Sequence, residues 1–271
     1  VGVVAVLVVG CSPSDPPVEP PPYVPRGQIL EIAGGPQWGP VASAPIPADS
    51  MPFSVYATAI RERDGLLYVR DHNKIVRIDP TSSTAQRVAG LGHTVDGIEL
   101  GTPLNDLLDP ASAGADNAYL DWSRSFDLGP DGDFYVDAVG AGPFLPASEG
   151  RRIFRIDSVT RKVSLVAGNG EAGPSVVGGP AAASPLDGVS LLRVDPSGAV
   201  WFNDHSYPDW YDPSTQRGRR IDPLTGRIDE VVLPPRFFGF DPQGRPLGAV
   251  VDSDANGNDI GFHLVARTAA D

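Results

Sequence analysis

The sequence has few of the residues that build reactive centres and covalent frameworks. Its 271 residues include one cysteine, one methionine and four histidines. A single cysteine allows no disulfide within the chain, so the fold has to be stable through its core alone. A Gly-Xaa-Ser-Xaa-Gly nucleophile elbow, a phosphate-binding loop and a zinc-helix motif are also absent. The hydrolase, nucleotide-binding and zinc-enzyme classes that these motifs mark therefore have no support.

Basic residues are scarce as well. Lys and Arg number 21 against 34 Asp and Glu, which gives a formal net charge of −13 at pH 7. A nucleic-acid partner requires a basic face for its phosphates, so the composition argues against nucleic acid. The same negative charge gives no electrostatic attraction to anionic lipid headgroups. Contact with a membrane would have to come from a lipid anchor.

Residues 1–10 form the longest apolar run. About 10 residues are too few to span a bilayer as a mature helix, which needs roughly 20, but they suit the apolar region of a signal peptide. The run ends in Val8-Val9-Gly10-Cys11, which resembles the lipobox of bacterial lipoproteins. The resemblance implies that Cys11 carries a lipid and that residues 1–10 are a signal-peptide remnant. The alternatives are that Cys11 is only a small apolar residue or that the run is the end of a membrane helix.

Residues 11–26 form a spacer that is rich in proline. Seven prolines lie between Ser12 and Pro25. This density favours an extended polyproline II conformation, which acts as a semi-rigid spacer. A lipid-anchored chain would then hold residues 27–271 away from a membrane of the cell envelope, facing the periplasm or the exterior.

A sequence phrase of strand-like segments occurs three times in residues 27–271. Each copy has a glycine turn, an apolar strand with a central aromatic residue, an Arg-bearing strand that ends in Ile-Asp, and a further strand. The copies begin at Gly65, Gly132 and Gly198, and a fourth, less regular unit begins at Phe238. Repetition of a short all-strand unit predicts an all-β fold, a β-propeller of four-stranded antiparallel blades. Asp195-Pro196-Ser197-Gly198 and its equivalents predict type I turns, because Pro presets φ and Gly takes the position after the turn.

The long insertion at residues 171–190 and the segment before it give the repeat a family likeness. The segment before it is Val166-Ala167-Gly168-Asn169-Gly170, and the insertion contains Gly178-Gly179-Pro180-Ala181. With the turns that follow, residues 27–235 resemble bacterial NHL repeats of the teneurin type. Propellers of that family usually have about six blades. Four units are visible here, and residues 28–35 resemble a lone outer strand that could complete the last blade; the alternative is a larger propeller that continues after Asp271.

Two histidines follow the second strand of their units. His72 stands beside Asp71, and His205 stands beside Asp204. Equivalent loops of a propeller open on one face around its axis, so these side chains could converge on a metal or act as acid and base. Some propeller lyases and lactonases that resemble this scaffold use central His and acidic residues with a divalent ion. The alternative is that both histidines are surface loop residues.

Asp252, Asp254, Asn256 and Asp259 match the start of a calcium-binding loop, with Gly257 at the sharp turn. The twelfth position, where an EF-hand needs a bidentate Glu, is a histidine. The alternative interpretation is a polar turn between two strands. Calcium or another divalent ion is the only cofactor that the sequence suggests.

Three aromatic residues, Tyr207, Trp210 and Tyr211, lie among acids in one loop. Exposed aromatics are typical anchors for a protein or glycan partner, although they could equally pack over the edge of a blade.

The leading functional hypothesis is a lipid-anchored extracytoplasmic propeller that acts as a non-catalytic scaffold for a protein or glycan. The alternative hypothesis is a metal-dependent lyase or lactonase with a central site. Specificity is expected in what differs between the repeats, above all in the long insertions 91–123 and 171–190.

The anchor hypothesis predicts that Cys11 is the acylated residue. Cells that express the full-length protein should incorporate a clickable fatty acid into it, and a Cys11→Ser variant should incorporate none, because the thiol is the acyl acceptor. Equal labelling of the two proteins would refute the lipobox interpretation.

Overall fold

The computed structural model describes most of the repeat region and isolated parts of the segments around it. The described residues are 33, 43–53, 57–71, 74–90, 102–103, 108, 118–120, 125–138, 150–205, 216–234, 236–241, 243–253 and 259–266. Within this part the chain is almost entirely β-structure, and its helical turns are the short 3₁₀ segments η1 (Ala48–Ser50) and η4 (Ala181–Ala183). None of the described helical turns is long and apolar enough to cross a bilayer.

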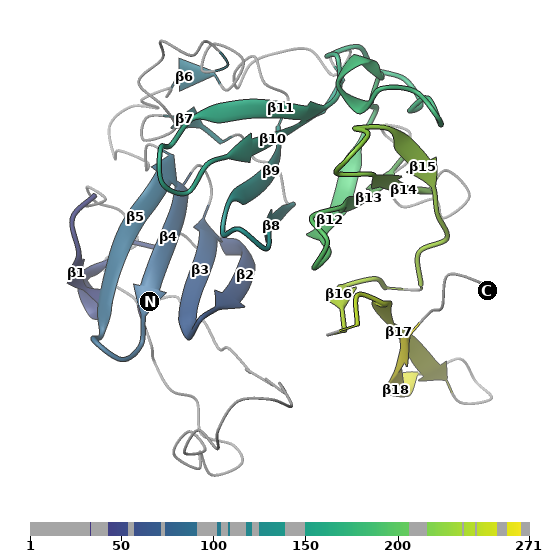
Figure 1. Ribbon diagram of the computed structural model, residues 1–271. Helices are drawn as coiled ribbons and strands as arrows, with labels where there is room; N and C mark the ends of the chain where they lie inside the picture. Colours follow the sequence, from purple (N-terminus) through teal and green to yellow (C-terminus); the bar gives the residue numbers. More distant parts are fainter. Residues whose placement is uncertain are drawn as a thin grey trace.

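Four antiparallel sheets form the blades of a propeller, as the repeat predicted (Figure 1). The first blade has the order β1-β5-β4-β3-β2, and the second has β11-β10-β9-β8. The bounds in these two blades are β1 (Ile46–Pro47), β2 (Ala57–Arg63), β3 (Leu66–Asp71), β4 (Lys74–Asp79), β5 (Thr84–Gly90), β8 (Phe126–Leu128), β9 (Phe134–Ala138), β10 (Arg152–Ile156) and β11 (Val163–Ala167).

The third blade has the order β12-β13-β14-β15, and the fourth has β16-β17-β18. A short parallel pair, β6 with β7, lies in the first insertion. The bounds of these strands are β6 (Thr102–Pro103), β7 (Ala118–Tyr119), β12 (Val189–Val194), β13 (Val200–Asp204), β14 (Arg217–Ile221), β15 (Ile228–Glu230), β16 (Gly239–Phe240), β17 (Pro246–Ser253) and β18 (Asp259–Ala266). The first strand of each repeat, β2, β8, β12 or β16, is the edge of its sheet nearest the middle of the molecule (Figure 1).

The predicted turns join the first and second strands of blades two, three and four. The glycines that end them are Gly132, Gly198 and Gly244, and each donates a 2.9 Å hydrogen bond to the carbonyl oxygen three residues earlier. Their φ angles, +89°, +85° and +77°, lie in the left-handed region that favours glycine. The turn chemistry that the sequence predicted is confirmed.

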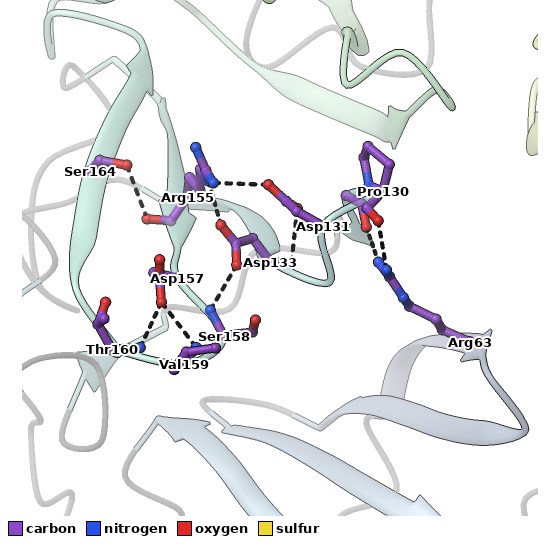
Figure 2. Close-up of polar contacts among 11 residues, drawn as sticks. Arg63, Pro130, Asp131, Asp133, Arg155, Asp157, Ser158, Val159, Thr160 and Ser164 are labelled. Carbon is purple, nitrogen blue, oxygen red and sulfur yellow. Dashed lines mark hydrogen bonds and ion pairs between the residues drawn. The ribbon is translucent and has the colours of Figure 1, made fainter.

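The aspartate that closes each Ile-Asp strand holds the following turn in place. The carboxylates of Asp79, Asp157 and Asp222 accept hydrogen bonds from backbone N–H groups two and three residues further along, at 2.6–3.2 Å. Figure 2 shows this arrangement for Asp157, beside the ion pair of Arg155 with Asp133 at 2.5 Å. The repeated Ile-Asp is thus explained by a side-chain-capped turn that needs no ligand.

Neighbouring blades pack through apolar side chains. A cluster between blades one and two joins Ile75 and Val88 to Phe126, Phe134 and Phe154. A second cluster joins blade two to blade three, and the buried phenylalanines in both clusters are less than 3% exposed. The apolar pattern of the repeat therefore forms the interfaces between blades.

The aromatic residue in the second strand of each unit packs on the blade that follows. Tyr68 lies 5.8 Å from Phe134 between ring centroids, and Trp201 lies 5.3 Å from Phe240. Tyr135, at the equivalent position of blade two, belongs to the cluster shared with blade three. Offset and edge contacts of this kind add about 0.5–1.5 kcal/mol beyond the area they bury.

One polar side chain from the innermost strand of each of the first three blades contacts the next blade. Arg61 donates from Nε to Asp127 Oδ1 at 2.5 Å, and Asp127 Oδ2 accepts the N–H of Val194 at 2.8 Å. Arg193 then donates from Nε to Phe238 O at 2.5 Å, at the start of the fourth blade. Arg61, Asp127 and Arg193 occupy equivalent positions of the repeat, and we call this chain of contacts the axial relay.

The proposed closing strand, residues 28–35, is described only at Ala33. This residue packs in the apolar cluster of the first blade, and β1 pairs with β5 on the outer edge of the same blade. The fourth blade has three described strands. Completion of that blade by the N-terminal segment therefore gains no support from the described residues.

The capped turns predict a loss of stability in acid. The pKa of Asp157 lies below its ordinary value of 3.8, because the carboxylate accepts hydrogen bonds from the Thr160 backbone and side chain and from the Val159 backbone. A lowered carboxyl pKa stabilises the fold above the unfolded-state value, and this contribution is lost as the pH falls through the folded-state value. The pKa values of Asp79 and Asp222 are also lowered, by hydrogen bonds from Ser82 and Thr225 respectively.

We therefore expect Asp157→Asn to be less stable than wild type in denaturant at pH 7, with the difference shrinking below about pH 4. Urea unfolding between pH 7 and pH 3 measures this, with Asp49→Asn, a change of an exposed residue, as the control. A difference that stays constant with pH would contradict the assignment.

Candidate functional site

Three aspartates end, or nearly end, the second strands of the first three blades. Asp71, Asp137 and Asp204 are each no more than 1% exposed. All three lie at the end of the blades that carries the insertions. Each insertion leads into a first strand, and the start of that strand pairs with the end of the second strand, as Val189 pairs with Asp204. Buried carboxylates need compensation, so their partners decide what each one can do.

The first two aspartates have structural partners. Asp71 pairs with the Lys74 ammonium at 2.7 Å, and both side chains are buried. Asp137 accepts the N–H of Ser125 at 3.0 Å and lies 3.7 Å from Arg151. These contacts fix the loops that leave the strands.

The two carboxylate oxygens of Asp204 have different environments. Its Oδ2 accepts hydrogen bonds from the N–H and the hydroxyl of Ser175, at 2.9 and 2.6 Å, and Arg219 Nε donates to the same hydroxyl oxygen at 2.6 Å. Arg217 Nη1 is 3.9 Å from Oδ2. The other oxygen, Oδ1, is buried and has no hydrogen-bond partner among the described residues. One face of this carboxylate is therefore satisfied and the other is not.

A second carboxyl group lies beside it. Asp187 immediately precedes Gly188 and the start of β12, and its pKa is raised, first by burial and then by the negative charge of Asp204. The positive charges of Arg217 and His205 oppose this shift. A nearby negative charge disfavours the charged form of a carboxyl group, so Asp187 is more easily protonated than a free aspartate.

His205 completes the group. It is 8% exposed, and its backbone N–H donates to Gly188 O at 3.2 Å. The imidazole packs directly on Gly188, since a Cβ at that position would lie 2.3 Å from the ring carbon Cε1. Asp187, Asp204 and His205 thus form what we call the blade-three cluster.

The structure describes part of the site that the sequence predicted. Asp204 and His205 are consecutive residues at the end of β13, and both are buried. Asp71 is held in a separate ion pair with Lys74. His72 lies outside the described residues, so its convergence with His205 stays a prediction.

The other predicted sites are described little or not at all. Asp252 and Asp259 belong to the paired strands β17 and β18, which agrees with a loop between two strands. Within the described part of the chain, no group of three or more His, Cys, Asp or Glu side chains is placed to hold a metal ion. The remaining candidates lie outside the described residues: Cys11, Asp254, Asn256, Tyr207, Trp210 and Tyr211.

Sequence reasoning missed Asp187 and Ser175. Both lie in the insertion 171–190, which was expected to carry specificity, but the repeat gives no rule for single residues inside an insertion. The available signal was Asp187-Gly188, an acid and a residue without a side chain directly before an innermost strand.

Comparisons with known proteins give only distant likenesses. No protein-family model matches the chain, and no curated protein matches it. A solved structure of a protein proposed to be a gluconolactonase is 16% identical over 75% of this chain and 61% of its own, with a TM-score of 0.37. The calcium-binding protein regucalcin from Agrobacterium tumefaciens strain C58 is 15% identical over 79% of this chain and 61% of its own, with a TM-score of 0.38.

A protein of unknown function from Bacteroides thetaiotaomicron VPI-5482 is 14% identical over 74% of this chain and 45% of its own, with a TM-score of 0.38. The chain therefore spans about three fifths of the length of the first two proteins and less of the third. Likeness at this level assigns neither a family nor a function, and membership of the NHL family stays a prediction.

The packing of His205 on Gly188 predicts that this position accepts no side chain. Gly188→Ala should destabilise the protein by about 1–3 kcal/mol, because the added methyl group must displace the imidazole. Gly239→Ala is the matched control, because a Cβ there meets nothing within 4 Å, and its effect should stay within about 0.5 kcal/mol. Urea unfolding of both variants measures the difference, and equal stabilities would contradict the described packing.

Proposed function

We propose that this chain is an enzyme that hydrolyses a small ester-like substrate of the lactone class by acid–base chemistry at the blade-three cluster. The observation that carries the proposal is the carboxyl pair of Asp187 and Asp204 beside His205. Asp71 and Lys74 carry opposite charges and neutralise each other, whereas Asp187 and Asp204 are both acids, and the pKa of Asp187 is raised. Titratable groups that lie close together and have shifted pKa values are typical of acid–base active sites.

Each member of the cluster has its own role. His205 accepts the proton of a water molecule as the water oxygen attacks the carbonyl carbon. Asp187, whose pKa is raised by burial and by Asp204, donates a proton to the ring oxygen as the carbon–oxygen bond breaks. Asp204 is a positioning residue, since its negative charge raises the pKa of Asp187. The products are a hydroxy acid and a restored cluster after one proton exchange with solvent.

The sequence-based alternative included a divalent ion. Such an ion would need ligands from loops outside the described residues, for example at His72, in addition to the acids of the blade-three cluster. Calcium or another divalent ion stays a prediction, and the roles given above belong to side chains of this chain alone.

The non-catalytic scaffold remains the competing hypothesis. Its proposed contact residues, Tyr207, Trp210 and Tyr211, belong to the loop that directly follows the cluster in sequence. A lipid at Cys11 would place either activity at the cell envelope.

The enzyme proposal predicts turnover that depends on Asp187 and His205. The full-length protein should release acid from members of a panel of aliphatic lactones in a pH-stat assay. Asp187→Asn and His205→Gln should each lower kcat by about 100-fold or more, the usual contribution of a positioned acid or base. Activity of the wild type should fall as the pH rises through the pKa of Asp187, and Asp187→Asn should lose this limb.

Asp49→Asn, a change of an exposed carboxylate on the first blade, is the matched control and should keep wild-type activity. Turnover that both cluster substitutions leave intact would refute the site. No turnover on any lactone, together with a glycan or protein ligand that binds the wild type, would favour the scaffold.

A further inference from the structure

A hollow of about 470 Å³ lies at the other end of the innermost strands, on the side of the predicted turns. All four blades line it. It is separate from the blade-three cluster, because the cluster lies at the start of β12 and the hollow lies at its end. The lining side chains used below are Arg61, Glu62, Asp127, Arg193, Asp195 and Asp241.

The hollow exists where one member of the axial relay is missing. Arg61, Asp127 and Arg193 fill the equivalent position in the first three blades, and the fourth blade has Gly239 there. A Cβ built on Gly239 would meet nothing within 4 Å, and its φ is not positive. The position therefore has room for a side chain, and its backbone does not require glycine.

The relay also lacks one hydrogen-bond acceptor. Arg61 uses Nε, Nη1 and Nη2 to bind Asp127 and two backbone carbonyl groups, at 2.5–2.9 Å. Arg193 uses Nε for Phe238 O and Nη1 for Leu192 O, at 2.5 and 2.6 Å. Its Nη2 makes no hydrogen bond with the described residues. A guanidinium group with a donor left over next to open space is a ready partner for an oxyanion.

The charges of the relay side chains alternate in sign over the first three blades only. The three side chains run positive, negative, positive, so the fourth position would be completed by a negative group. Burial and the charge of Arg61 lower the pKa of Arg193 to about 10, although Asp127 opposes the shift. Arg193 is therefore still protonated at pH 7, but its charge is poorly compensated, and a neighbouring anion would stabilise it.

The acids around the hollow limit which anion fits. Asp195 accepts hydrogen bonds from Ser197, Ala199 and Trp201, and Asp241 accepts them from Gln243 and Arg245. Glu62 accepts the N–H of Gly65 at 2.9 Å. These carboxylates are occupied, but their charge still repels anions, so a singly charged group is favoured over a doubly charged one.

We propose that the hollow binds the carboxylate of a small organic acid, which takes the place left by Gly239 and pairs with Nη2 of Arg193. The hollow has room for the rest of such a molecule beside Phe238 and Phe240, which also line it.

Thermal unfolding of the full-length protein tests the proposal with acetate, lactate and gluconate as probes, against phosphate and chloride at equal ionic strength. A ligand that binds only the folded state raises the unfolding temperature in a saturable way. We expect saturable stabilisation by at least one carboxylate, and weaker stabilisation by phosphate. Arg193→Gln should weaken carboxylate binding about 10- to 100-fold, the usual contribution of a charged hydrogen bond.

Lys162→Gln removes the same charge from an exposed turn and is the matched control, which should keep the wild-type response. Stabilisation that is the same for chloride, phosphate and carboxylates, or that Arg193→Gln leaves unchanged, would overturn the proposal.

A second pair of variants tests the site without an added ligand. Gly239→Asp places a carboxylate in the hollow, and Gly239→Asn places a neutral group of the same shape there. We expect Gly239→Asp to be the more stable of the two at pH 7 in the absence of carboxylates, and to lose the response to acetate that Gly239→Asn retains in part. Equal stability and equal response of the two variants would overturn the proposal, even if Arg193→Gln fails to fold.

Discussion

The axial relay is the contact on which the relative placement of the blades depends. An antiparallel blade can slide or rotate on an apolar interface, because dispersion and the hydrophobic effect have little direction. The Arg61 to Asp127 contact, and the bond from Val194 to Asp127, do have direction. Hydrogen bonds to charged groups contribute about 1.5–3 kcal/mol each, and leaving one partner unsatisfied costs a comparable amount. The apolar clusters therefore hold the blades together, and the relay fixes how they meet.

Strand β12 connects the two ends of the molecule that carry candidate sites. Its first residue, Val189, pairs with Asp204 in the blade-three cluster, and Arg193, near its other end, belongs to the relay. The central residue Leu192 is fully buried in the interface with blade two. A paired strand of this kind positions groups at both ends more accurately than a loop could. The insertion before β12 then supplies Asp187 and Ser175, so the chemistry varies while the scaffold stays the same.

The sequence predicted the propeller from its repeat and the turns from local residues. The turn ending at Gly198 follows from residues within four positions of each other, so its chemistry is visible in the sequence. The axial relay could not be predicted in this way, because Arg61 and Asp127 are 66 residues apart and their meeting depends on the packing of two blades. The raised pKa of Asp187 likewise depends on burial and on Asp204, which only the folded chain brings together. The available signal was that Arg61, Asp127 and Arg193 are charged residues at equivalent positions of the repeat.

A polar group that departs from the repeat is recognised because the other blades keep the pattern. A polar group that recurs in the first three blades is explained by the fold, as Asp79, Asp157 and Asp222 are by their turns. Asp204 Oδ1 is buried and has no hydrogen-bond partner in the described chain, and Arg193 Nη2 makes no hydrogen bond with the described residues. A buried acceptor without a partner costs free energy, and a donor beside open space is available to a ligand. The two sites proposed at the ends of β12 therefore differ in character, because the group at one end is a hydrogen-bond acceptor and the group at the other end is a donor.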